Sequence, residues 1–142
     1  MTVVLSRNAD ALTVTLATAL IHYQTPKYHG EAKAAFEGVL GRNTKYGLAL
    51  VGLGLILEEQ QDYAGAADLL EKALTLSPYD VKIMSEAAWC NVLQAKYEEG
   101  KTQLENCLHL ITGVDPRSRN LKAQVLWRIG TAVWNSDGNN AC

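Results

Sequence analysis

The side chains that most often do chemistry are few in this sequence and poorly spaced for it. No histidine has a cysteine or a carboxylate at a spacing typical of a metal site, and neither a CxxC nor an HExxH motif occurs. The cysteines follow no regular interval. We therefore predict no catalytic residue, no metal site and no bound cofactor. The residues concerned are His22, His29, His109, Cys90, Cys107 and Cys142.

The other chemically suggestive groups favour structural interpretations. Gly52 and Gly54 belong to no GxGxxG pattern and no Gly-Lys-Ser/Thr follows them, so they do not predict a phosphate loop. We expect Gly54 to allow two helices to pack closely and Gly52 to leave a flat spot on an inner face. The paired carboxylates, Glu58-Glu59 and Glu98-Glu99, fall where helices end and are expected to be solvated.

Composition limits the class of protein. The chain has 142 residues, 48% hydrophobic and 20% charged, which is typical of one soluble globular domain. A net charge of −2 does not favour binding to a phosphate backbone. The apolar stretch 11–21 is too short for a membrane span and lacks the features of a signal peptide. Three irregularly spaced cysteines do not form a disulfide framework, which indicates a reducing compartment. We therefore expect the cytoplasm, with the nucleus as the alternative.

A 34-residue pattern organises the chain. In residues 47–80, Leu53-Gly54 and Ala66 stand where two helices of a hairpin would approach closely, and Pro78 ends the unit. The pattern recurs in phase over residues 13–46 and 81–114, and an extra helix is expected over 118–134, before a disordered tail at 135–142. This periodicity resembles the tetratricopeptide repeat. It predicts an all-α solenoid of helical hairpins, with seven helices in about three and a half repeats, as one domain over 1–142.

The tryptophans are the best candidates for partner binding. In tetratricopeptide arrays the first helix of each repeat lines a concave groove, and the repeat phase puts Trp89 and Trp127 at groove positions that would be neighbours. Aromatic anchors in an apolar groove are typical of protein hot spots. The alternative is that both rings pack between helices, as we expect for Trp134. The other expected groove residues are Val14, Ala17, Ile21, Leu48, Val51, Leu55 and Val92.

A local basic cluster lies near Trp127. Its members would contact an acidic partner or a phosphate, although such a cluster is more often a solvated surface, and we expect no direct nucleic-acid binding. The predicted partner-binding residues are therefore Leu55, Trp89, Trp127 and Arg128. The cluster comprises Arg117, Arg119, Lys122 and Arg128.

The last predicted helix lacks a partner helix in this sequence. Its apolar residues, among them Leu126, Ile129 and Val133, are spread around much of its circumference instead of forming the polar outer face of a capping helix. We therefore predict self-association through this helix, or its place at the start of a further repeat.

Four stretches, 54–60, 85–90, 115–119 and 123–130, go beyond the generic repeat. They resemble the tetratricopeptide scaffold subunits of fungal superkiller (Ski) complexes. The resemblance implies a scaffold that joins a DExH-type RNA helicase to WD40-repeat subunits and helps to deliver RNA to the cytoplasmic exosome for 3′-to-5′ mRNA decay. A tetratricopeptide adaptor of an unrelated assembly and a small enzyme are the alternatives.

Overall fold

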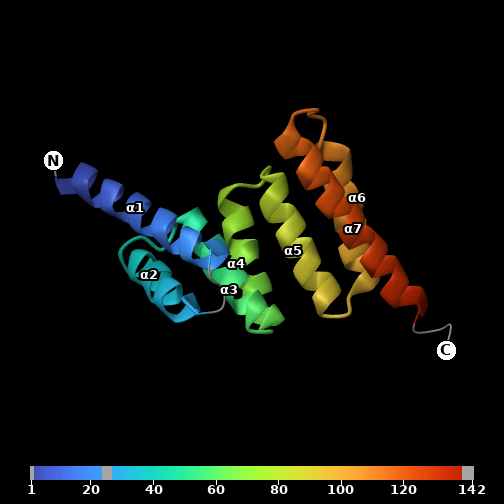
Figure 1. Ribbon diagram of the computed structural model, residues 1–142, viewed down its shortest axis with the longest axis horizontal. Helices are drawn as coiled ribbons and strands as arrows, with labels where there is room; N and C mark the ends of the chain where they lie inside the picture. The colour runs from blue at the N-terminus through green and yellow to red at the C-terminus, as the bar shows by residue number, and fades with distance from the viewer. Residues whose placement is uncertain (1, 24–26, 139–142) are drawn as a thin grey trace. The chain divides into compact units, whose positions relative to one another are not determined.

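The computed structural model describes residues 2–23 and 27–138, together with the side chains of residues 9–21 and 27–138. Over that part of the chain it contains seven α-helices and no strand, as the sequence predicts (Figure 1). The helices are α1 (Thr2–Tyr23), α2 (His29–Arg42), α3 (Gly47–Glu59), α4 (Tyr63–Leu76), α5 (Val81–Leu93), α6 (Tyr97–Leu110) and α7 (Pro116–Gly138).

The helices form two compact units. The first unit, Met1–Leu76, contains α1 to α4, and the second, Ser77–Cys142, contains α5 to α7. The organisation of residues 1–142 as one domain stays a prediction. Among the described residues, no helix is both long and apolar enough to cross a membrane.

The 34-residue repeat is visible in the backbone of two turns. Gln61, between α3 and α4, has a φ of 66°, and Ala95, 34 residues later between α5 and α6, has a φ of 64°. The turns also share their hydrogen bonds: the Asp62 N–H donates to the Leu57 carbonyl at 2.8 Å, and the Lys96 N–H to the Asn91 carbonyl at 2.9 Å. A residue with positive φ after the helix thus lets the chain donate hydrogen bonds to carbonyls near the helix end, which would otherwise lack an intrahelical partner.

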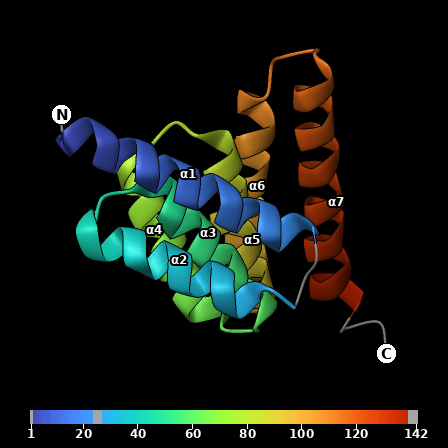
Figure 2. The ribbon, with the colours of Figure 1, turned by 60° about the vertical axis from the view of Figure 1, so that its left-hand side comes forward.

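In the first unit, small residues bring helices close together, and the layers of α1, α2 and α3 can be followed in Figure 2. A Cβ added at Gly54 would lie 3.2 Å from Cγ of Leu70 on α4, which confirms its predicted packing role. A Cβ at Gly52 would overlap the ring of Phe36 on α2. Gly52 is therefore covered by an aromatic ring and is not the open flat spot we expected.

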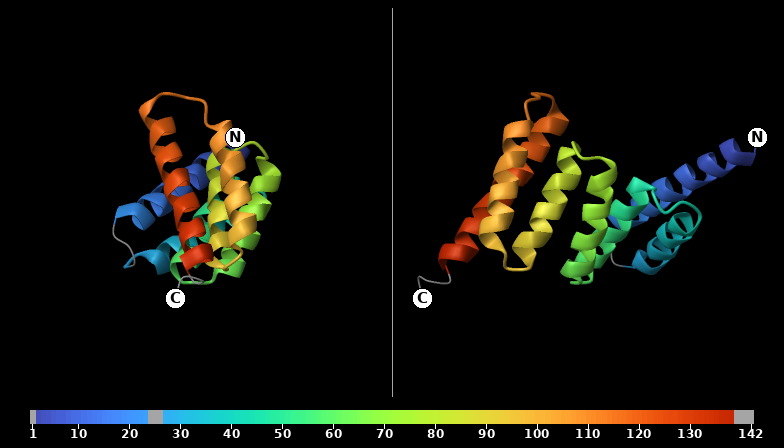
Figure 3. Two further views of the ribbon diagram at one scale, coloured as in Figure 1. Left: turned by 90° about the vertical axis from the view of Figure 1, so that its right-hand side faces the viewer. Right: turned by 180° about the vertical axis from the view of Figure 1, so that it is seen from behind.

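The second unit packs α6 against both α5 and α7 (Figure 3). Gly100 on α6 occupies the repeat position of Ala66, and a Cβ there would lie 3.0 Å from the Ala88 carbonyl oxygen on α5. The absence of a side chain thus permits close packing of α5 and α6. The buried cluster of this unit consists of Ala88, Val92, Leu104, Cys107, Val125 and Ala132.

Helix boundaries differ from the prediction at both ends of the chain. Helix α1 begins at Thr2, where the first repeat was expected to begin at residue 13, and Asp10 in this extension accepts a 2.6 Å hydrogen bond from Nη2 of Arg42. Helix α7 spans 116–138 instead of 118–134. Pro116 suits the first helical position because it has no N–H to leave unpaired. Residues 135–138 are helical, which corrects the predicted start of the tail, and residues 139–142 lie outside the described part.

Candidate protein-interaction surface

Two tryptophans from different helices of the second unit meet. The ring centroids of Trp89 on α5 and Trp127 on α7 are 5.5 Å apart, with an interplanar angle of 47°. This spacing is within the range of favourable aromatic pairs. Trp127 remains 63% exposed, whereas Trp89 is half-buried. The prediction that the two rings are neighbours is confirmed, and the exposed ring of Trp127 is accessible on the surface of this unit.

A buried ion pair lies beside the tryptophan pair. Nη2 of Arg128 on α7 donates to both carboxylate oxygens of Glu86 on α5, at 3.1 and 3.2 Å, and Nη1 donates to Oγ of Ser85 at 3.0 Å. The guanidinium carbon also lies 5.4 Å from the ring centroid of Trp89, within cation–π range. Only 6% of Arg128 is exposed, so the Glu86 carboxylate and not water neutralises its charge.

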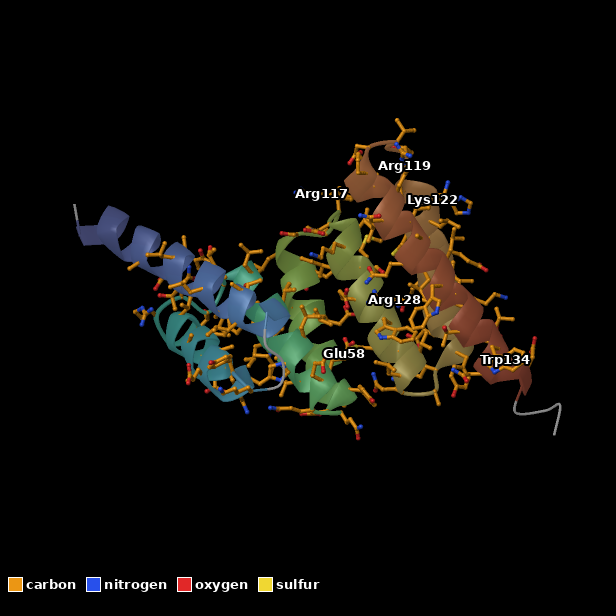
Figure 4. All side chains as sticks on the ribbon, in the orientation of Figure 1. Glu58, Arg117, Arg119, Lys122, Arg128 and Trp134 are labelled. Atoms are coloured by element: carbon orange, nitrogen blue, oxygen red, sulfur yellow. The ribbon has the colours of Figure 1, made fainter. Side chains whose placement is uncertain are left out.

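The basic cluster predicted from the sequence is therefore divided. Arg117, Arg119 and Lys122 are exposed near the N-terminal end of α7, whereas Arg128 lies farther along α7, towards α5 (Figure 4). Nε of Arg119 donates to the Val114 carbonyl at 2.8 Å. The exposed cluster consists of three residues, and Arg128 belongs to a separate buried network.

The start of α7 is fixed by a local cap. Oδ1 of Asp115 accepts a 2.6 Å hydrogen bond from the Ser118 hydroxyl, and Oδ2 accepts from the Ser118 N–H at 3.2 Å. These two hydrogen bonds hold the pKa of Asp115 below its ordinary value, because both favour the charged carboxylate. The bond from the Ser118 hydroxyl has the larger effect, and the bond from the Ser118 N–H has the smaller one. An acceptor before the first turn satisfies donors that the helix itself leaves open.

Cys107 illustrates why the cysteines are not predicted to be chemically active. Its side chain lies in the buried cluster of the second unit, and burial raises the pKa of its thiol above the ordinary value. A neutral, buried thiol acts as a small hydrophobic group and not as a nucleophile. Cys90 is also buried, and Cys142 lies outside the described residues.

His29 occupies a repeated position in the fold. His29 begins α2, as Tyr63 begins α4 and Tyr97 begins α6, and it is buried. The side chain of His22 lies outside the described residues. In the described part of the chain, no group of three or more His, Cys, Asp or Glu side chains is placed to hold a metal ion.

Other expected groove residues are placed differently from the prediction. Val14, Ala17 and Ile21 are buried in the core of the first unit, and Val92 in that of the second, because neighbouring helices cover the faces that carry them. Leu55 is half-buried on α3. Trp134, expected between helices, is 76% exposed, because it lies on the side of α7 away from the buried residues.

Sequence reasoning missed the ion pair of Glu86 and Arg128. The two residues are 42 positions apart, so no local helix spacing connects them. The available signal was Glu86 itself, a carboxylate between Ser85 and Ala87 on an otherwise apolar helix stretch. A charge in such a position is expected to find a partner, but only the packing of α5 with α7 identifies it.

Comparison with known proteins agrees with the repeat architecture. Two family models, both described as "Tetratricopeptide repeat", match residues 16–81 and 57–125. The chain is 28% identical over 113 residues to Superkiller protein 3 of Saccharomyces cerevisiae and 26% identical over 125 residues to Superkiller protein 3 of Schizosaccharomyces pombe. These alignments cover 80% and 88% of this chain but only 8% and 9% of the relatives.

Solved structures share the fold at low sequence identity. The type III secretion translocator chaperone SycD of Yersinia enterocolitica superposes with a TM-score of 0.77 at 18% identity, covering 92% of this chain and 96% of SycD. The Sgt2 TPR domain of Aspergillus fumigatus gives a TM-score of 0.68 at 14% identity, covering 93% and 82% of the two chains. At these identities the likeness concerns the fold alone.

Proposed function

We propose that this chain, which belongs to the tetratricopeptide repeat family, is a non-catalytic scaffold segment that joins an RNA helicase to WD40-repeat subunits of a superkiller-type assembly. In this proposal the assembly serves exosome-mediated 3′-to-5′ mRNA decay in the cytoplasm. The similarity to Superkiller protein 3 from two yeasts over most of this chain carries the proposal. The repeat family itself implies the coarser function, a scaffold for protein interaction.

The tryptophan pair supplies the anchor in this proposal. An exposed indole next to a second aromatic ring offers a large apolar contact area, and hot spots are enriched in tryptophan. Arg128 supports this surface from inside, since its guanidinium lies over Trp89 and is fixed by Glu86. We infer that Arg128 positions Trp89 and does not itself bind the partner. Leu55 on α3 is a separate proposed partner contact, in the first unit.

The charges around the pair define the chemistry of the partner. Glu86 and Arg128 neutralise each other, so the ring of Trp127 should receive an apolar or aromatic side chain. The exposed cluster of Arg117, Arg119 and Lys122, on the same helix, should favour acidic residues nearby in the partner sequence. Such rim charges mainly raise the association rate and give salt dependence, whereas the buried aromatic contact supplies affinity.

Affinity purification of the tagged chain from a fungal lysate tests the proposed function. We expect mass spectrometry to recover an RNA helicase and a WD40-repeat protein, and Trp127→Ala to reduce their recovery about tenfold or more, as for a hot-spot residue. The matched control is Tyr79→Ala, which removes a 90% exposed aromatic side chain between α4 and α5. Repeated absence of both proteins would contradict the superkiller-type assignment.

The same experiment tests the alternative of an unrelated adaptor. Recovery of a different, reproducible set of proteins, lost with Trp127→Ala and kept with Tyr79→Ala, would favour that alternative. Among the structural neighbours, one SycD structure is a complex with a peptide of the translocator YopD. That complex concerns SycD, but it motivates a search for a linear peptide in whichever partner is recovered.

A further inference from the structure

The beginning of α7 lies outside the 34-residue repeat. The pair Ile129-Gly130 on α7 repeats the pair Leu53-Gly54 on α3 after 76 residues, which is eight residues more than two repeats. The contacts of α7 agree with this shift, because Arg128 bonds to Glu86, 42 residues earlier, whereas the turns before α4 and α6 recur after 34 residues. Eight extra residues are therefore inserted between α6 and the repeated part of α7.

The insertion takes the form of additional helix. α5 begins at Val81, and at an offset of 42 residues its counterpart on α7 is Ala123, yet α7 already begins at Pro116. Residues 116–122 therefore add about two turns to α7, which starts beyond the beginning of α5 (Figure 1). We call residues 115–122 the inserted segment. Insertions into repeat proteins often lie on the binding face.

A further hairpin built like the first ones would leave the inserted segment uncovered. α4 packs against Gly54 through Leu70 and ends at Leu76, six residues later. Because the two helices of a hairpin are antiparallel, α4 reaches only the first turn of α3. A helix of the same length packed against Gly130 would reach only Gln124. The exposure of the inserted segment therefore does not depend on the chain that follows α7.

The inserted segment carries unpaired positive charge. Arg117, Arg119 and Lys122 are exposed (Figure 4), and none of them forms an ion pair with another described residue. The single carboxylate of the segment, Asp115, accepts the two hydrogen bonds from Ser118 that cap the helix. Three cations and one carboxylate leave a formal charge of +2. The segment is therefore suited to an anionic ligand that the side chains bind, since Asp115 already occupies the helix terminus.

Two of the cations can contact one anion. Arg119 and Lys122 are three residues apart on a helix, so their Cβ atoms lie about 5–6 Å apart on one face. The hydrogen bond from Nε of Arg119 to the Val114 carbonyl restrains the guanidinium, and its two Nη groups bond to no described residue. Such free, oriented donors suit the oxygens of a phosphate. Arg117 lies on the other side of α7 and adds only to the surrounding field.

A phosphate monoester matches this site better than a carboxylate does. It carries about 1.5 to 2 negative charges at pH 7 and has three acceptor oxygens, enough for both side chains. We propose that Arg119 and Lys122 bind a phosphorylated serine or threonine of the protein partner that Trp127 contacts. The proposal rests on the proposed scaffold function and specifies the acidic group of that partner. A nucleic-acid backbone is the less favoured source of phosphate, because the whole chain has a net charge of −2.

Titration of the full chain with a blocked phosphoserine amide, followed by NMR at constant ionic strength, tests the site. We expect saturable shifts at Arg119 and Lys122 with a dissociation constant on the order of a few millimolar, and binding of a blocked aspartate amide about tenfold weaker. Arg119→Gln with Lys122→Gln should raise the constant about tenfold or more. The matched control, Lys45→Gln with Lys72→Gln, removes the same charge from exposed positions in the first unit and should change it less than about twofold.

Three results of the titration would overturn the proposal. They are the absence of saturable shifts, equal affinity for the aspartate amide, and an equal loss in the control variant. Tighter binding of a twelve-residue oligouridylate, lost in the Arg119→Gln, Lys122→Gln chain, would assign the site to nucleic acid instead.

Lysate capture separates the phosphate site from the scaffold function. We expect phosphatase treatment of the lysate to reduce partner recovery by the parent chain as much as the Arg119→Gln, Lys122→Gln variant does. Recovery unchanged by phosphatase would overturn the phosphorylated partner while leaving the scaffold function intact. If no partner is captured at all, the scaffold function fails, and with it the phosphorylated partner, whereas the titration still decides whether the inserted segment binds phosphate.

Discussion

Replacing Glu86 by leucine would leave the Arg128 guanidinium buried without its carboxylate. The side chains of Arg128 and Glu86 are only 7% and 9% exposed, so water can hardly replace the lost contact. Removing one member of a buried ion pair typically costs about 3–5 kcal/mol. We therefore expect Glu86→Leu, and likewise Arg128→Met, to lower the free energy of unfolding by about that amount. In the first variant Arg128 keeps its hydrogen bond to the Ser85 hydroxyl but loses its counter-ion.

The double variant distinguishes pairing from simple loss of packing. With both charges replaced by apolar groups, no uncompensated charge remains, so Glu86→Leu with Arg128→Met should lie within about 1–2 kcal/mol of the parent chain. The coupling energy of the cycle should then be about 3 kcal/mol or more. Lys101 and Glu105 on α6 provide the control: their closest atoms are 4.0 Å apart and their side chains are 36% and 47% exposed, so their coupling should be below about 0.5 kcal/mol.

Tryptophan fluorescence is the suitable readout for urea unfolding of these variants. All three tryptophans of the chain lie in the second unit, so fluorescence reports the unit that contains the ion pair. Circular dichroism follows both units and detects any separate transition. If each single substitution costs less than 1 kcal/mol, or if the coupling equals that of the α6 pair, Arg128 is not held by Glu86 as the structure indicates.

Three further predictions concern the turns, the core and the cap. Gln61→Gly and Ala95→Gly should each stabilise the chain by about 0.5–1 kcal/mol, because glycine adopts a positive φ without steric cost; a loss of melting temperature in either would contradict the repeated turn geometry. The neutral Cys107 thiol stabilises the fold fully below its ordinary pKa of 9.0, and this contribution is lost as the pH rises towards its raised value. Urea midpoints should therefore fall more steeply above pH 9.0 for the parent chain than for Cys107→Ala. Ser118→Ala should raise the pKa of Asp115 towards 3.8, as followed by NMR titration of its carboxyl carbon, and an unchanged pKa would show that the cap does not form in solution.

The repeat positions were predictable because they follow from local spacing. The 34-residue period identified Gly54, Ala66 and Pro78 as key positions. In the structure α4 ends at Leu76, two residues before Pro78, and packs closely against Gly54. Helix ends were less predictable. The turn-forming residues at 135–138 are poor helix formers, yet the helix continues through them. Helical propensity is a weak guide at a helix terminus, where tertiary context often overrides it.

The sequence by itself determined which helices form and that Trp89 and Trp127 would be neighbours, because both follow from periodicity along the chain. Only the tertiary structure decided that Arg128 is an internal cation and that Trp134 is exposed. A basic residue near other basic residues predicts a surface cluster, but one helical step of 100° turns Arg128 to the packed face of α7 while Trp127 stays at the surface. The partner of that charge, 42 residues earlier on α5, is set by packing between helices and not by any local pattern.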